Sequence, residues 1–215
     1  MLLAGIQVGR PRRLGGEGVE PWTSGYGKLP VHGEVFLGKL NLDGDGQANA
    51  RWHGGPEMAV LAYASAHYPR WREELSWPEL GPGAFAENFT VDGVDEETAC
   101  IGDIWEVGEA RLQISEPRQP CRNISRFWHR EQLLRLTEQT GRIGWYLRVL
   151  REGLVQAGQQ IALVERPHPE WPIARAMSAR KHKSRDPETA ALLAACPALG
   201  GDWRQRLLEI KAGSD

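Results

Sequence analysis

Short apolar stretches separated by Gly, Pro and Asp turns recur through the first three quarters of the chain. Five of them have the length and the residue types of strands: Leu3–Val8, Gly33–Leu37, Asp103–Val107, Leu112–Ser115 and Gln160–Val164. Closely spaced short strands with turn signals between them are typical of a β-barrel or a β-sandwich. The pattern therefore predicts a mainly β core.

Two segments within this part of the chain have helical periodicity instead. They span Ala64–Leu75 and His129–Thr137, and the glycine at position 141 is a helix-ending signal for the second. The following segment, Gly141–Leu150, has the pattern of a strand after a turn. On such a strand Tyr146 and Arg148 would share one face, and Arg148 could reach an anion or simply face solvent.

The character of the chain changes after residue 164. Three prolines, Pro167, Pro169 and Pro172, indicate a linker. Three short helices are predicted beyond it: Ile173–His182, a helix capped by Asp186 with proline at its first position, and Trp203–Lys211. The sequence thus predicts a β-barrel domain over residues 1–165, followed by a three-helix domain over residues 166–215.

Charge and cysteine usage narrow the classes of function. The formal net charge is −2, so no overall basic field would recruit nucleic acid; a local basic segment from Arg166 to Arg185 holds six Lys/Arg against one acid, Glu170. No apolar run approaches transmembrane length, and no signal-like core is present. We expect a cytoplasmic protein with reduced thiols, without nucleic acid or membrane partners. Cys100 and Cys196 lie in apolar surroundings and are predicted to be packing residues.

The strongest candidate for chemistry is the loop Pro117–Asn123, which directly follows a predicted strand. It places Cys121 between Arg118 and Arg122. A thiolate is a soft ligand for a transition metal, and nearby guanidinium groups favour the thiolate over the thiol. The same guanidinium groups suit a phosphate, which they can bind in bidentate fashion. The loop therefore offers a metal ligand and an anion site together, although a free cysteine is more often a buried packing residue.

Two further segments carry polar groups that need an explanation. In Arg51–Pro56, His53 precedes two glycines, which would either allow close approach to a ligand or form a tight turn. In Phe85–Thr90, Glu87 and Asn88 lie among apolar residues, where a structural role is the commoner one. No Walker loop, GxGxxG or GxSxG motif is present.

Taken together, these segments resemble the MOSC family, the domains similar to the C-terminal part of molybdenum cofactor sulfurases, and within it the YiiM-like branch. The matching segments are Asn41–Gln47, Arg51–Pro56, Ala59-Val60, His67-Tyr68 with Trp71, Phe85–Thr90, Ile101–Asp103, Pro117–Cys121 and Gly144–Val149. The C-terminal helices resemble the three-helix domain that follows in that branch. The resemblance therefore covers nearly the whole chain.

The resemblance implies a barrel that holds molybdenum cofactor, a pyranopterin dithiolene with a terminal phosphate, and implies that Cys121 ligates the metal. His53 is the candidate proton donor beside it, because the ordinary pKa of histidine lies near neutrality. The candidate cofactor-binding residues are Arg118, Arg122, Asn123, Glu87, Asn88, Arg51 and Arg148. We expect His53, Glu87 and Asn88 to line the same pocket as Cys121.

The resemblance also implies an activity, the reduction of N-hydroxylated bases or amines with electrons from a separate flavoprotein reductase. The alternative is a non-redox carrier of the cofactor or of its sulfur, which would also use Cys121. A homodimer is one option for the assembly, and the basic segment would suit an acidic flavoprotein surface. Three positions depart from the family pattern: Trp52 where histidine is frequent, Asn49 where aspartate is frequent, and Ala86 in place of glycine.

Overall fold

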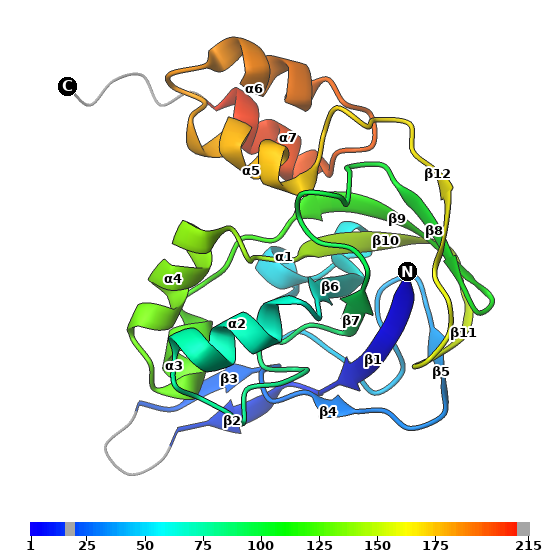
Figure 1. The fold of residues 1–215 in the computed structure, drawn as a ribbon, viewed down its shortest axis with the longest axis vertical. Helices are drawn as coiled ribbons and strands as arrows, with labels where there is room; N and C mark the ends of the chain where they lie inside the picture. Colours follow the sequence, from blue (N-terminus) through cyan, green and yellow to red (C-terminus); the bar gives the residue numbers. More distant parts are fainter. Residues whose placement is uncertain (16–19, 210–215) are drawn as a thin grey trace.

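A curled eight-stranded sheet forms the body of the protein (Figure 1). The computed structural model describes residues 1–15 and 20–209. The order across the sheet is β12-β8-β9-β10-β6-β7-β1-β4, and all neighbours are antiparallel except the parallel pair β6 and β7. The strands are β1 (Leu2–Val8), β4 (Leu29–Pro30), β6 (Val60–Ala64), β7 (Phe89–Asp92), β8 (Ile104–Val107), β9 (Ala110–Pro117), β10 (Trp145–Arg151) and β12 (Ala162–Glu165). Two short ribbons join β2 (Arg12–Leu14) to β3 (Trp22–Ser24) and β5 (Glu34–Leu37) to β11 (Gly153–Gln156).

The helices form two groups around this sheet (Figure 1). In the first three quarters of the chain they are α1 (Ala50–His53), the 3-10 turn η1 (Pro56–Met58), α2 (His67–Glu74), α3 (Asn123–Trp128) and α4 (Gln132–Thr140). The C-terminal group is α5 (Ile173–Lys181), α6 (Pro187–Ala194) and α7 (Gly201–Leu208). No helix within the described residues is both long enough and apolar enough to cross a membrane.

The predicted architecture is confirmed, a β-rich half-barrel followed by three helices, and the predicted strands fall within one or two residues of β1, β5, β8, β9 and β12. The cap predicted at Asp186 is also present, since its side chain accepts a hydrogen bond of 3.0 Å from the backbone N–H of Thr189. The end of the predicted helix Trp203–Lys211 lies partly outside the described residues, because the description stops at residue 209.

The helix boundaries in the middle of the chain differ from the prediction. The segment predicted from Ala64 begins as the last residue of β6, and α2 starts only at His67. The predicted helix at 129 starts later because His129 has a left-handed backbone, with φ of 53°, and ends α3 instead. Strand β6 was not predicted, since all five of its residues are buried and a strand covered on both faces shows no alternation.

The three C-terminal helices share one hydrophobic core with the half-barrel. Trp171, Ile173 and Trp203 belong to the same buried cluster as the sheet residues. Backbone hydrogen bonds join the two parts, including Ile101 N–H to Trp171 O at 2.9 Å and Ile173 N–H to Ala99 O at 2.9 Å. A change in secondary structure near residue 165 is therefore not a break in packing. We therefore expect the half-barrel and the helices to unfold as one unit.

A single substitution in α7 tests whether the two parts unfold together. Trp203 is 2% exposed, and truncating a buried tryptophan to alanine costs about 3–5 kcal/mol. We expect Trp203→Ala to lower the stability of the whole chain in one cooperative transition, measured by denaturant unfolding and circular dichroism. Leu192→Ala, at a site 59% exposed on neighbouring α6, should change stability by less than about 0.5 kcal/mol. Two separate transitions would contradict the shared core.

Candidate functional site

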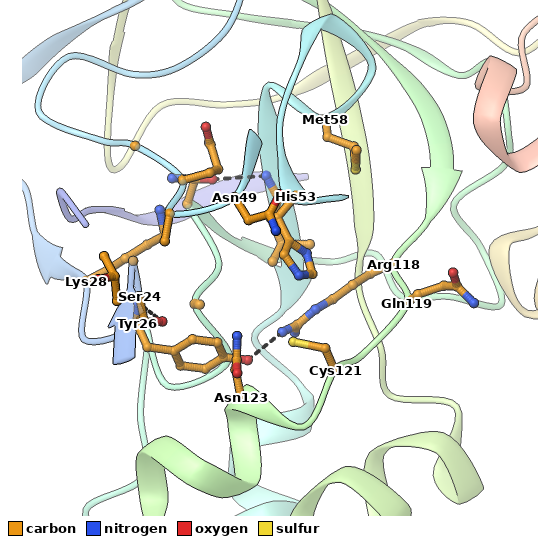
Figure 2. A pocket seen from close by; sticks show the side chains of 18 of the residues that line it. Ser24, Tyr26, Lys28, Asn49, His53, Met58, Arg118, Gln119, Cys121 and Asn123 are labelled. Atoms are coloured by element: carbon orange, nitrogen blue, oxygen red, sulfur yellow. Dashed lines mark hydrogen bonds between the residues drawn. The ribbon is translucent and has the colours of Figure 1, made fainter. Parts of the chain in front are cut away.

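Segments far apart in the sequence meet around one cavity of about 390 Å³. The cavity lies where the β3 ribbon, the loop before α1 and the chain after β9 come together (Figure 2). Its lining includes Trp22, Ser24, Tyr26, Lys28, Asn49, His53, Met58, Ala86, Asn88, Arg118, Gln119, Cys121, Asn123, Arg126 and Tyr146. Five of the predicted site residues are thereby brought together: His53, Asn88, Arg118, Cys121 and Asn123.

Arg118 is a buried cation at the base of this cavity. Arg118 is 4% exposed. One terminal nitrogen of its guanidinium group, Nη2, donates a hydrogen bond of 2.9 Å to the Tyr26 hydroxyl (Figure 2). The other, Nη1, is buried without a hydrogen-bond partner among the described residues. Burial opposes the charge, but the neighbouring Tyr26, Tyr146 and Cys121 outweigh it and raise the pKa of Arg118 above its ordinary value. A permanent positive charge with an unused donor is suited to an anion.

Cys121 lies between Arg118 and the start of α3, and its side chain is half-buried in the cavity wall. Figure 2 shows the thiol and the guanidinium of Arg118 directed into the same space. The other two cysteines are 3% and 4% exposed, and burial raises the pKa of both thiols. Cys100 and Cys196 are thus packing residues, as predicted, and Cys121 is the cysteine with access to the cavity.

His53 is the last residue of α1, and its side chain lines the cavity. The two glycines after it form the turn into η1, and Gly55 has a φ of 95°, which a side chain would strain. The glycine pair therefore forms a tight turn next to His53. This is the second of the two roles considered for it, and not close approach of the backbone to a ligand. Burial, followed by the charge of Arg118, lowers the pKa of His53. Its imidazole is accordingly neutral at pH 7 in the ligand-free protein and offers one N–H donor.

Glu87 does not line the cavity, contrary to our expectation. Its carboxylate is fully buried and accepts hydrogen bonds from the hydroxyl of Tyr68, from the backbone N–H groups of Gly83 and Phe85, and from Thr90. The hydrogen bonds from the backbone N–H groups of Gly83 and Phe85 to this carboxylate are 2.6 Å and 3.1 Å long. Glu87 therefore holds the loop before β7 in shape, and a carboxylate with these donors has no need of a ligand.

Asn88 does line the cavity, but its side chain is already anchored. Its Oδ1 accepts a hydrogen bond of 3.1 Å from Leu61 N–H, and its Nδ2 donates to Asp45 at 2.8 Å. Asp45 in turn forms an ion pair with Lys28. This network fixes the wall of the cavity, and it brings a lysine to the site that no local sequence pattern had indicated.

Three other predicted residues lie outside this cavity. Arg122 is exposed and not part of the lining. Arg148 donates to Glu57 and, at 2.8 Å, to the carbonyl of Ala198, so it joins the barrel to the three-helix region. Arg51 is exposed and lines a neighbouring, smaller cavity. A role for Arg122 or Arg148 in holding a ligand in the first cavity is therefore not supported.

The comparisons with known proteins identify the class. Residues 49–162 match the MOSC domain, and residues 171–209 match the YiiM-like, 3-alpha helix domain. The chain therefore belongs to the MOSC family. It also has the domain arrangement of the YiiM-like branch, with the three-helix region directly after the half-barrel.

Individual relatives agree with this assignment. Protein YflK of Bacillus subtilis is 36% identical over 206 residues, 96% of this chain and 92% of that protein; protein YiiM of Escherichia coli is 33% identical over 86% and 83% of the two chains. The crystal structure of YiiM from Geobacillus stearothermophilus has a TM-score of 0.82 at 33% identity, covering 96% of this chain and 97% of that one. A Gibberella moniliformis protein named reductase is 38% identical over 177 residues, but these are only 31% of its length.

Ala86 is strained at the edge of the cavity. Its φ of 60° lies in the left-handed region, which costs a residue with a Cβ about 1–2 kcal/mol. We expect Ala86→Gly to stabilise the protein by about 1 kcal/mol in denaturant unfolding, even after the greater flexibility of glycine in the unfolded chain is counted. Ala191→Gly, at an exposed position within α6, should do the opposite and cost about 1 kcal/mol. If both variants lose stability equally, Ala86 is not strained.

Proposed function

We propose that the protein binds molybdenum cofactor in the first cavity and reduces N-hydroxylated bases or amines, with electrons from a separate flavoprotein. The observation that carries the proposal is the pairing of Cys121 with Arg118 in one cavity, where a buried guanidinium nitrogen has no partner. A soft thiolate ligand and an anion site are the two features that a metal cofactor with a phosphate needs. Membership of the MOSC family and the reductase name of one relative point in the same direction.

The residues of the cavity fit this group in charge and in polarity. Cys121 would supply the thiolate ligand, and Arg118 would bind an anionic oxygen of the cofactor through its free Nη1. The side chains of Asn49 and Asn123 also face the cavity and can both donate and accept hydrogen bonds, as a pterin ring requires. When bound, the cofactor would supply two-electron redox chemistry, which no side chain offers unaided.

His53 would act as a neutral donor in the ligand-free site and as a proton relay once an anion is present. Its pKa is lowered by burial and by Arg118, and a bound anion that neutralises Arg118 removes the second of these causes. Binding of the cofactor would therefore remove the electrostatic part of the lowering, while the larger cause, burial, would remain.

The basic segment has less freedom to dock a flavoprotein than its sequence indicated. Arg166 forms an ion pair with Asp103 at 2.6 Å. Arg175 and Arg180 lie over the rings of Trp171 and Trp203, each 4.7 Å from the ring centroid. Lys183 donates to backbone carbonyls at the end of α7. Most of these charges therefore help to pack the three-helix region, and an electron donor would have to be identified by reconstitution rather than from this segment.

The metal ligand can be tested directly. Cys121→Ala, purified from a molybdenum-replete host, should lose bound molybdenum, because alanine offers no soft donor. Metal analysis and the fluorescence of the oxidised pterin are the measurements. Cys100→Ala and Cys196→Ala are the matched controls and should retain both signals. Full molybdenum occupancy in Cys121→Ala would refute its role, and a wild-type protein that retains molybdenum but reduces no N-hydroxylated compound would favour the carrier alternative.

The anion site can be tested separately from the metal. Arg118→Lys keeps the positive charge but removes the planar pair of donors, so the pterin signal retained after gel filtration should fall by about tenfold. Tyr26→Phe is the control, since it removes the hydrogen bond to Arg118 and leaves the guanidinium in place. Retention should stay within about twofold of the wild type in Tyr26→Phe. Equal retention in Arg118→Lys and the wild type would show that the anion is held elsewhere.

A further inference from the structure

A second cavity, of about 240 Å³, adjoins the first at Cys121. The two cavities share five residues, His53, Met58, Gln119, Cys121 and Tyr146. In Figure 2, Met58 and Gln119 lie on the side of Cys121 away from Tyr26, and both also line the second cavity. A group bound in either cavity would therefore be next to the same thiol and the same imidazole.

The second cavity is lined by the barrel on one side and by α7 on the other. Asp202, Trp203 and Arg206 of α7 form part of its wall, facing Trp52 and Glu116. Its volume is below the roughly 300–1,000 Å³ of sites for drug-sized ligands, so it suits a molecule of about the size of one nucleobase. A wider groove of about 810 Å³ adjoins it and shares Gln119, Pro120 and Arg206 with it.

Glu116 is the unusual side chain in this cavity. It is 6% exposed, yet its carboxyl group has no hydrogen bond or ion pair to any other described residue. It lies opposite Tyr146 in the pairing of β9 with β10, and it contacts the backbone of Gly200, where an added Cβ would collide with the carboxyl oxygen. A carboxyl group that is buried in this way and faces a cavity is available to a ligand or to bound water.

Burial and nearby carboxylates together keep the carboxyl group of Glu116 neutral. Burial is the largest cause of the raised pKa of Glu116. The nearby carboxylates Glu57 of η1 and Asp202 of α7 raise this pKa further, while Arg206 of α7 and Arg148 of β10 lower it. Both arginines have other partners: Arg206 donates to Gln119 at 2.8 Å, and Arg148 forms an ion pair with Glu57. A third arginine, Arg180 of α5, also faces Glu116 and lies over the ring of Trp203. The balance raises the pKa of Glu116 to about 8. At pH 7 the group is therefore a carboxylic acid with an O–H to donate.

We propose that the second cavity is the substrate pocket, that it takes a small planar N-hydroxylated compound, and that Glu116 donates a hydrogen bond to the hydroxyl oxygen of that compound. This inference rests on the proposed function, because that function supplies the substrate class and the electrons. The shared wall puts the reacting N–O group beside Cys121, and α7 closes the pocket. The three-helix region thereby has a role in the site as well as in the core.

The proton balance of the reaction gives Glu116 a defined part. Cleavage of R–NH–OH to R–NH₂ and water takes two electrons, supplied through the cofactor from the flavoprotein, and two protons. The N–O bond breaks, and its oxygen leaves as water. Glu116 would supply one proton to the departing oxygen and would then be protonated again from water in the pocket, and His53, on the shared wall, would relay the other to the nitrogen.

Ligand binding without turnover tests the pocket. The probe is 6-N-hydroxylaminopurine, titrated into the full-length protein by calorimetry with no electron donor present. We expect the affinity of the wild type to be constant below about pH 7 and to fall about tenfold as pH rises through about 8, because the donor is then lost. Glu116→Gln keeps an N–H donor that does not titrate, so this fall should disappear. Glu116→Ala should bind about tenfold more weakly at pH 6.

Two further variants locate the probe and separate this inference from the proposed function. Asp202→Phe should fill the second cavity from α7 and abolish binding, while molybdenum content stays at the wild-type level. Glu79→Ala, at an exposed site on the barrel surface, is the control and should change nothing. Wild-type affinity in Asp202→Phe or in Glu116→Ala overturns the inference even when molybdenum is retained. Probe binding that depends on Glu116 in a protein that never holds molybdenum would instead contradict the proposed function alone.

Discussion

The buried guanidinium of Arg118 is the constraint around which the site is organised. A charge removed from water is costly unless it is paired or hydrogen-bonded, and Arg118 satisfies this requirement only in part. The Tyr26 hydroxyl accepts a hydrogen bond from one terminal nitrogen of Arg118, and the other terminal nitrogen has no partner among the described residues. Arginine cannot lose its charge as a lysine or histidine would, so the protein retains a fixed demand for an anion beside Cys121. The same charge contributes to keeping His53 neutral.

The packing of the three-helix region has consequences for chemistry as well as for stability. Trp203 anchors α7 in the shared core, and this places Asp202 and Arg206 at the wall of the second cavity. Gly200, just before α7, leaves room for the Glu116 carboxyl group. The half-barrel alone would leave that cavity open to water, and water would restore the ordinary acidity of Glu116, since burial is the first cause of its raised pKa.

Two buried glutamates have opposite uses here. Glu87 receives hydrogen bonds from two backbone N–H groups and two hydroxyl groups, which satisfy its oxygens and fix the loop before β7. Glu116 receives none from the described residues and faces a cavity. The first is satisfied and serves the fold, and the second is available to a ligand. Residue type and apolar flanks could not separate these two roles, because the partners of Glu87 come from α2, from β7 and from the loop itself.

The sequence by itself determined the mainly β architecture, the three C-terminal helices and the importance of the Pro117–Asn123 loop. These features depend on local signals, namely turn residues, a capping aspartate and a lone cysteine between arginines. Tertiary structure decided which of the candidate residues share a cavity. Tyr26, Lys28 and Glu116 were not found, because nothing near them in the chain marks them, whereas Arg148 was assigned to an anion although it joins the barrel to the loop before α7. Local patterns report backbone geometry, but the partner of a buried charge is set by contacts between distant segments, which only the folded chain defines.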